Sequence, residues 1–255
     1  MIDRELVKRE FKSYVSGYDI NDDKIKLKVL HTYKVASNCE NIATSLNLSS
    51  SDVDLAWLIG MLHDIGRFEQ LRRFHTFIDK DSIDHAKFGA DLLFNEGLID
   101  RFKVDGKLYP VIESAIRFHN YFVLPDDIDE RTLLFAKIIR DADKTDIFRV
   151  AVEFSAAVVY DTTEEALKDA SISDEVLDAS LKHLTVDKEI RKSPVDYIVS
   201  HISLVYGLYF PVSLKVVKDQ GFLQKVMDFR NDNPQTNERM KLISDEVNRY
   251  IEECG

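Results

Sequence analysis

The sequence predicts an all-α protein, and three observations support this prediction. Glycine (9) and proline (5) are scarce among the 255 residues, so strong helix breakers are few. Good helix formers such as Leu, Ala, Lys and Glu recur throughout the chain. Apolar residues follow a helical period, as in residues 22–46, where His31, Val35, Ile42 and Leu46 share one face.

The other elements follow in order. Residues 52–64 form a helix that is apolar nearly all round, which is typical of a buried central helix, and "NLSSSD" before it ends in N-capping residues. "RFEQLRRFHTFIDKDS" predicts an irregular, partly basic connection that ends where Asp81 or Ser82 caps a helix. That helix extends to about residue 95, and Gly97 ends it. Further helices are predicted from Pro110, from about 129, and over about 163–170, 173–183, 194–210, 212–229 and 236–253.

The domain organisation expected from these elements is simple. We expect a single all-α domain over residues 1–255, with a core at about 22–150 and a C-terminal helical extension at about 151–255. The helices of the extension are amphipathic and rich in aromatic residues. They could cover a site, select a substrate or form a homodimer, and the sequence leaves these three roles open.

Charge and composition narrow the classes of partner. The net charge of −11 disfavours long nucleic acids and anionic membranes. Cys39 and Cys254 predict reduced thiols, and the charged N-terminus does not resemble a signal peptide. Residues 197–214 carry no formal charge, but their polar residues predict a buried helix broken at Pro211 rather than a membrane span. We therefore expect a cytoplasmic protein with no membrane and no nucleic-acid polymer as partner.

Residues 60–68, "GMLHDIGRF", place His63 and Asp64 at the end of the apolar helix. From His31 to the end of its helix the chain rises roughly 22 Å, and from Asp52 to His63 it rises roughly 16 Å. A short loop makes the two helices antiparallel neighbours, so His31 is expected near His63 and Asp64. Gly66 is expected to end the helix without placing a side chain in the site.

The helix predicted from about residue 129 contains three aspartates. Asp143 shares its face with apolar residues, whereas Asp141 lies among polar ones and is expected to be more solvated. Because a buried carboxylate is costly unless it is paired or bound to a metal, Asp143 is the better candidate ligand. Asp146 lies near it and could orient a ligand.

Four further histidines outside the His63-Asp64 pair need an interpretation. His85 and His119 each lie on an apolar helix face, where a lone histidine is usually a hydrogen-bonded core residue. Spacing alone leaves that interpretation open beside a ligand role. His183 and His201 are interpreted as structural residues.

Together, His31, His63-Asp64 and Asp143, the last within "RDADK", resemble the HD superfamily of metal-dependent phosphohydrolases over about residues 22–150. In binuclear members two more histidines lie between the HD pair and the last aspartate, and "HAKFGADLL" and "AIRFHN" match them. Mononuclear members often carry a glutamate three residues after the HD aspartate, where this chain has Arg67; "HDIGR" is similar to the "HDIGK" of binuclear branches. The resemblance implies one metal held by His31, His63, Asp64 and Asp143, and a second held by Asp64, His85 and His119, with Asp64 bridging.

The expected activity is hydrolysis of a phosphoester or phosphoanhydride in a small phosphorylated substrate, with a nucleotide favoured. Two divalent transition-metal ions (Fe, Mn, Zn, Co or Ni) are the expected cofactors. Asp64, Arg67 and Lys144 are the expected catalytic residues, and the expected substrate contacts are Arg67, Arg72, Arg73 and His75. A solvated loop remains the plain alternative for "LRRF".

Two other functions remain open. HD-fold mixed-valent di-iron oxygenases resemble this chain in the same six ligands, and a non-catalytic metal- or nucleotide-binding HD module would keep the fold. The chain lacks a "GYP" element, so cyclic dinucleotides are not supported as substrates, whereas dinucleoside polyphosphates remain open.

Overall fold

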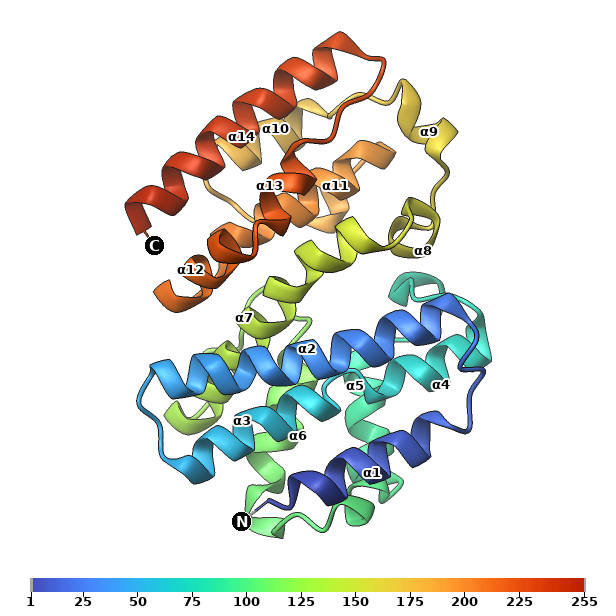
Figure 1. The fold of residues 1–255 in the computed structure, drawn as a ribbon, viewed down its shortest axis with the longest axis vertical. Helices are drawn as coiled ribbons and strands as arrows, with labels where there is room; N and C mark the ends of the chain where they lie inside the picture. Colours follow the sequence, from blue (N-terminus) through green and yellow to red (C-terminus); the bar gives the residue numbers. More distant parts are fainter. Residues whose placement is uncertain (1, 255) are drawn as a thin grey trace. The chain divides into compact units, whose positions relative to one another are not determined.

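The computed structural model describes residues 2–254 and confirms the all-α prediction (Figure 1). Within these residues there is no β-strand. The α-helices are α1 (Arg4–Val15), α2 (Asp23–Ser45), α3 (Ser50–Leu62), α4 (Ile65–Phe74), α5 (His85–Ala90), α6 (Tyr109–Phe118), α7 (Glu130–Glu153), α8 (Ala156–Tyr160), α9 (Glu164–Lys168), α10 (Asp174–Leu181), α11 (Pro194–Ile202), α12 (Pro211–Gln220), α13 (Phe222–Met227) and α14 (Pro234–Cys254). Short 3-10 or π segments are η1 (Asp79–Asp81), η2 (Asp91–Asn95), η3 (Leu98–Phe102), η4 (Gly106–Leu108), η5 (Lys188–Ile190) and η6 (Ser203–Gly207).

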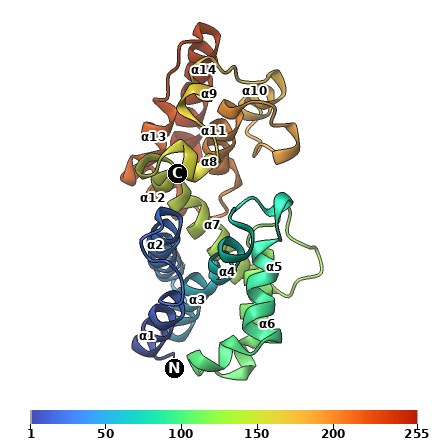
Figure 2. The ribbon, with the colours of Figure 1, turned by 90° about the vertical axis from the view of Figure 1, so that its right-hand side faces the viewer.

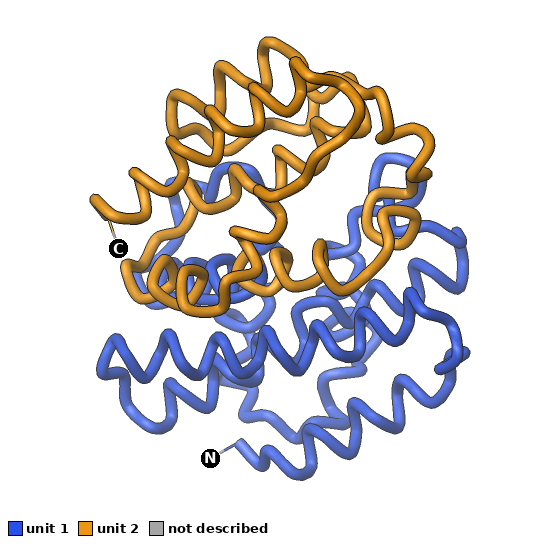
Figure 3. The backbone as a smooth tube through the Cα atoms, turned by 45° about the horizontal axis from the view of Figure 1, so that its top comes forward, with its two compact units in different colours: residues 1–143 blue, residues 144–255 orange. Residues whose placement is uncertain are grey.

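The chain divides into two compact units, residues 1–143 and 144–255, and the boundary lies inside α7 (Figure 3). This boundary is close to the one expected between the core and the C-terminal extension, at about residue 150. Whether the chain behaves as one domain stays a prediction.

In the first unit, α2 and α3 form an antiparallel pair, and α1 lies beside α3 (Figure 1). The side chain of Ser49 accepts a hydrogen bond from the Asp52 amide and caps α3, as the sequence predicted. On the other side of the unit, α5 packs against α4 and α6 (Figure 2). Pro110 lies in the first turn of α6, as expected.

Helix α4 (Ile65–Phe74) corrects a prediction, because residues 67–82 were expected to be an irregular connection. Ile65, Phe68 and Leu71 are buried at helical spacing, whereas Arg72 and Arg73 are exposed. The helix is therefore amphipathic, and its two arginines belong to the exposed face. Gly66 lies in the first turn of α4 and does not simply end α3.

Two other boundaries in this unit were not predicted. The charged segment at the N-terminus forms α1, which buries Leu6, Val7 and Phe11. The cap of α5 is Asp84, whose carboxylate accepts from the amides of the next turn, and not Asp81 or Ser82. Gly97, with φ of 78°, follows the π-helical continuation of α5, in agreement with the sequence.

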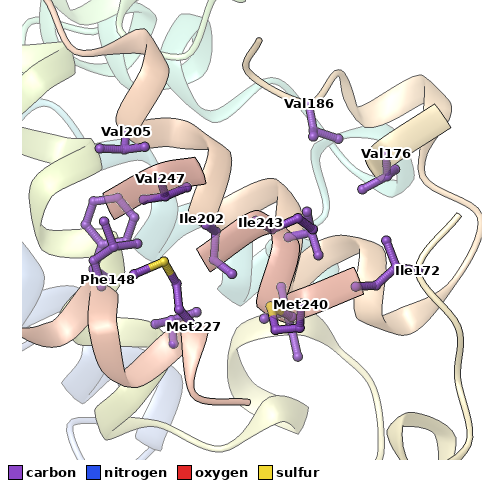
Figure 4. Close-up of a cluster of buried hydrophobic side chains, with 14 of the residues drawn as sticks. Phe148, Ile172, Val176, Val186, Ile202, Val205, Met227, Met240, Ile243 and Val247 are labelled. Carbon is purple, nitrogen blue, oxygen red and sulfur yellow. The ribbon is translucent and has the colours of Figure 1, made fainter. Parts of the chain in front are cut away.

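The second unit has its own apolar core (Figure 4). Phe148 of α7, Met227 of α13 and Val247 of α14 are among the buried side chains labelled there. The helix predicted over 212–229 is divided at Gly221, whose φ of 67° ends α12 in the left-handed conformation. The helix predicted to reach residue 210 instead ends at Ile202 and continues as η6.

No helix within residues 2–254 is both long enough and apolar enough to cross a membrane. The uncharged stretch 197–214 belongs to α11, η6 and α12, and its last helix begins at Pro211. A helix was predicted to continue up to a break at Pro211, but α11 already ends at Ile202, so the break lies earlier in the chain and Pro211 only begins the next helix.

Candidate metal centre

The α2–α3 pair places His31 beside His63, and both side chains are buried. The helices approach closely because α3 carries Gly60 at the contact. A Cβ on Gly60 would lie 2.6 Å from the Ala36 Cα, which no folded backbone tolerates without a shift. The apolar turns of α3 thus hold His63 at a fixed position at the end of the helix.

Asp64 occupies the junction between α3 and α4 and is buried. Two residues after Asp64, a Cβ on Gly66 would lie 2.6 Å from the His85 carbonyl oxygen and 2.7 Å from the Gly89 nitrogen. Two glycines therefore let α4 and α5 touch at the backbone. This contact brings His85, the first residue of α5, to Asp64.

The first group of candidate ligands surrounds one oxygen of Asp64. Its Oδ2 lies 3.7 Å from His31 Nε2 and 3.6 Å from His63 Nε2. Oδ1 of Asp143, from α7, lies 3.0 Å from His31 Nε2 and 3.8 Å from His63 Nε2. The structure thus brings together the four residues that the resemblance assigned to one metal.

The second group surrounds the other oxygen of Asp64. Its Oδ1 lies 3.5 Å from His85 Nε2 and 3.8 Å from His119 Nε2, and these two nitrogens are 3.1 Å apart. The two groups therefore share Asp64 but use different oxygens of its carboxylate. All six predicted ligands converge, and they come from α2, α5, α7, the C-terminal end of α6 and the α3–α4 junction.

Hydrogen bonds at Nδ1 orient the imidazole rings of His63, His85 and His119. Nδ1 of His63 lies 2.8 Å from the Gly60 carbonyl oxygen, and Nδ1 of His119 lies 2.7 Å from that of Ile116. Nδ1 of His85 lies 2.6 Å from a carboxylate oxygen of Asp79. Since each acceptor requires a proton on Nδ1, the lone pair of each Nε2 faces the centre.

This donor set fits metal ions. His63 Nε2 is buried and has no hydrogen-bond partner among the described residues, which is costly unless an ion binds there. Imidazole nitrogens and carboxylate oxygens bind ions such as Zn²⁺ at about 2.0–2.2 Å, so two ligands of one ion lie roughly 3–4 Å apart. The distances above lie in this range. The residues could therefore hold one ion in each group.

The protonation states also favour metal binding. Burial alone would raise the pKa of Asp64, but Lys28 and the neighbouring histidines hold it well below its usual range. The same balance, with His31 as the main partner, lowers the pKa of Asp143. Burial lowers the pKa of His85 and of His119 to about 4. Neutral imidazoles and ionised carboxylates are the forms that bind metals.

Two cations reach Asp64, and the sequence pointed to only one of them. Arg67, which was predicted, lies with its Nε 3.7 Å from Asp64 Oδ1, while its Nη1 donates to Gln70, to the Phe77 carbonyl and to Asp79. Arg67 Nε is buried without a hydrogen-bond partner among the described residues.

Lys28 was missed: its Nζ donates to Asp64 Oδ2 at 2.7 Å. Its position three residues before His31 on α2 is the signal that could have identified it, because residues at that spacing share a helix face. Asp79, which orients His85 and pairs with Arg67, was also missed, since "FIDKDS" has no helical period.

The remaining predicted site residues have other contacts. Arg72 and Arg73 both donate to the buried carboxylate of Glu69, on α4. His75 is the C-cap of α4, in the left-handed conformation. Lys144 Nζ donates to the Gly207 carbonyl oxygen, within the second unit. None of these contacts is with a candidate metal ligand.

The other two aspartates of α7, Asp141 and Asp146, lie in surroundings of their own. Asp141 was expected to be solvated, but its residue is fully buried, together with Arg140 and Thr145. That expectation was wrong because α7 is buried on most sides. Residues outside its apolar face are therefore buried as well. The carboxylate of Asp146 accepts two hydrogen bonds from Arg149 at 2.7 Å each.

Successive helices direct four histidines and Asp64 to one buried point, and Asp143 lies beside His31 with its side chain 19% exposed. This arrangement is typical of a class of all-α proteins with a metal centre inside a helical bundle. Residues 29–147 match the sequence model of the HD domain family. The chain therefore contains an HD domain, and the match lies within the range where the resemblance was found. No curated protein and no solved structure matched the chain significantly.

Proposed function

We propose that this protein is a metal-dependent phosphohydrolase that cleaves a phosphoester or phosphoanhydride of a small molecule, with a nucleotide as the first candidate. The observation that carries the proposal is the environment of Asp64. Each of its two oxygens faces a different pair of histidine nitrogens, which is the arrangement that a carboxylate bridging two ions requires.

In this proposal His31, His63, Asp64 and Asp143 hold one divalent ion, and Asp64, His85 and His119 hold the other. Bound there, such ions supply Lewis-acid activation of water and of a phosphoryl group. The donor set suits Fe, Mn, Zn, Co or Ni and does not choose among them. The apolar turns of α3 and the glycine contacts keep the ligands in place.

Lys28 and Arg67 supply the positive charge that phosphoryl transfer needs. Lys28 Nζ and Arg67 Nε approach different oxygens of Asp64 and so lie on the two sides of its carboxylate. Both side chains also lie against the Phe77 ring, at 5.5 Å from its centroid. We assign them the binding of phosphoryl oxygens, whereas the catalytic role of Lys144 stays a prediction.

The charge of the chain supports a small substrate. A net charge of −11 repels a polyanion, whereas a mononucleotide-sized anion needs only the local cations at the centre. The six ligands are equally compatible with an HD-type di-iron oxygenase, so the test must separate the two reactions.

The test combines metal analysis with an activity screen. Protein purified without chelators is assayed anaerobically on nucleotides and phosphomonoesters for phosphate release. We expect phosphate release that is lost in Asp64→Ala and kept in Asp81→Ala, a control at an exposed aspartate. Oxygen consumption without anaerobic phosphate release would support the oxygenase instead. Absence of metal, even after reconstitution, would support a non-catalytic module.

A further inference from the structure

A cavity of about 430 Å³ lies in the first unit and is separate from the metal centre. It is bordered by residues of α1, α4 and the segment from η2 to η3. None of the six candidate ligands lines it, and neither Lys28 nor Arg67 does. Its volume is within the range of pockets that bind small organic molecules.

Helix α4 separates the cavity from the metal centre. Glu69, Arg72 and Arg73 have the spacing of one helix face and line the cavity. Arg67 and Gln70, three residues apart, share a different face and meet at Asp79. The arginines that the sequence assigned to the substrate therefore serve a different cavity from the metal centre.

Arginine side chains gather at this cavity in a protein that is otherwise strongly acidic. Three arginines line it, together with Glu69 and Glu96. Arg101 completes the set and donates to Glu10, which lies outside the cavity lining, at 2.9 Å. With Glu10 the carboxylates match the guanidinium groups in number, so an anionic ligand would be held by the guanidinium N–H groups that these carboxylates leave over and not by a net positive charge.

The arginine pair is held by a shared carboxylate and by aromatic rings, although both side chains are largely exposed. Both Arg72 and Arg73 donate to the same oxygen of Glu69, a residue that is only 4% exposed. The other oxygen of Glu69 lies 3.2 Å from the Tyr18 hydroxyl. The guanidinium groups also lie over aromatic rings, Arg72 over Tyr18 at 5.6 Å and Arg73 over Phe88 at 5.2 Å.

One buried carboxylate cannot satisfy two guanidinium groups. Among residues 2–254, Glu69 takes a single N–H of Arg72 and a single N–H of Arg73 in hydrogen bonds. The remaining N–H groups of these planar forks match the oxygens of phosphate, which arginine binds in bidentate fashion. Leu92 and Leu98 add apolar surface for an organic group.

We infer that this cavity is a second ligand site, distinct from the metal centre, that binds a small organic molecule through a phosphate or diphosphate group. Arg72, Arg73 and Arg101 bind the anionic group, and Glu69 positions the first two. The site goes beyond the proposed hydrolase activity and does not depend on it.

The test is calorimetric titration of the full-length protein with methylenediphosphonate, a diphosphate analogue that resists hydrolysis. We expect binding that persists in Asp64→Ala, where the metal centre is disrupted. Arg73→Gln and Arg101→Gln should each weaken this binding at least tenfold, since each loses a charged donor to the ligand. Arg101 does not touch Glu69, so this variant leaves the buried carboxylate paired.

The control is Arg131→Gln, which removes an exposed arginine of α7 that pairs with Asp52, does not line the cavity and should leave the affinity unchanged. Three results would overturn the inference: no binding in Asp64→Ala, binding that neither arginine variant weakens, or an equal loss in Arg131→Gln. The last result would indicate unspecific attraction by surface charge.

Discussion

Asp64 is the residue on which the whole centre depends, because it is the only ligand that faces both histidine groups. At the scale of single residues, the candidate metal ligands could be predicted from the sequence. His, His-Asp and Asp on successive apolar helices can be recognised without a structure, and all six predicted residues converge. Lys28 was missed although its spacing from His31 pointed to it, because "DKIKLK" contains three lysines and packing shows directly which of them is turned inward.

Replacing Lys28 tests the second cation of the centre. Lys28→Met keeps the length of the side chain but removes the ammonium group that binds Asp64. We expect kcat/KM for the best phosphorylated substrate to fall roughly 10- to 100-fold, as for loss of a charge-assisted hydrogen bond, while the metal content is unchanged. Lys26→Met is the matched control, because Lys26 is exposed on the same helix and pairs with Asp23. Equal activity of the two variants would contradict the role given to Lys28.

At the scale of the element, α4 was the main failure of sequence-based prediction. "RFEQLRRF" looks like a basic loop because its charges outnumber its apolar residues. Its helix is stabilised by burial of Phe68 and Leu71, which is a tertiary effect, and by local pairs of Glu69 with the arginines three and four residues later. Helices with long apolar periods, α2, α3 and α7, were placed within a few residues, since their pattern does not depend on such contacts.

The contact of α4 with α5 makes Gly66 a sensitive position. In Gly66→Ala the new methyl group would lie 2.6 Å from the His85 carbonyl oxygen, so backbone must move. We expect the free energy of unfolding to fall by about 1–3 kcal/mol, measured by urea denaturation. The matched variant Gly106→Ala meets no atom within 4 Å and should change stability by less than about 0.5 kcal/mol. Equal stability of both variants would show that the two helices can separate without cost.

At the scale of the whole molecule, the overall charge and the burial of the centre determine how the protein responds to pH. The sequence placed the boundary between core and extension only approximately, at about residue 150, because the apolar period of α7 is continuous across residue 143, where the two compact units divide. The buried histidines, in contrast, make a clear prediction about stability. Their pKa values in the folded, metal-free chain are about 4, compared with about 6.5 in an unfolded chain.

The unfolded chain therefore takes up protons before the folded chain does as the pH falls. We expect the free energy of unfolding of chelator-treated protein to decrease between about pH 6.5 and about pH 4, with no further change from these two groups at lower pH. Each histidine contributes a slope of up to about 1.4 kcal/mol per pH unit. The double variant His85→Gln/His119→Gln should lose most of this slope above pH 5, where carboxylates contribute little. A wild-type stability that is constant or increases on acidification over this window would refute the expectation.

The central claim is that Asp64 joins two metal ions, and metal stoichiometry tests it most directly. Protein reconstituted with one divalent ion and freed of excess should hold about two equivalents in the wild type, about one in His85→Ala and in His119→Ala, and almost none in Asp64→Ala. Circular dichroism checks that each variant is folded. If His85→Ala and His119→Ala both kept the wild-type stoichiometry, the second ion would not exist and the account of Asp64 as a bridge would be wrong.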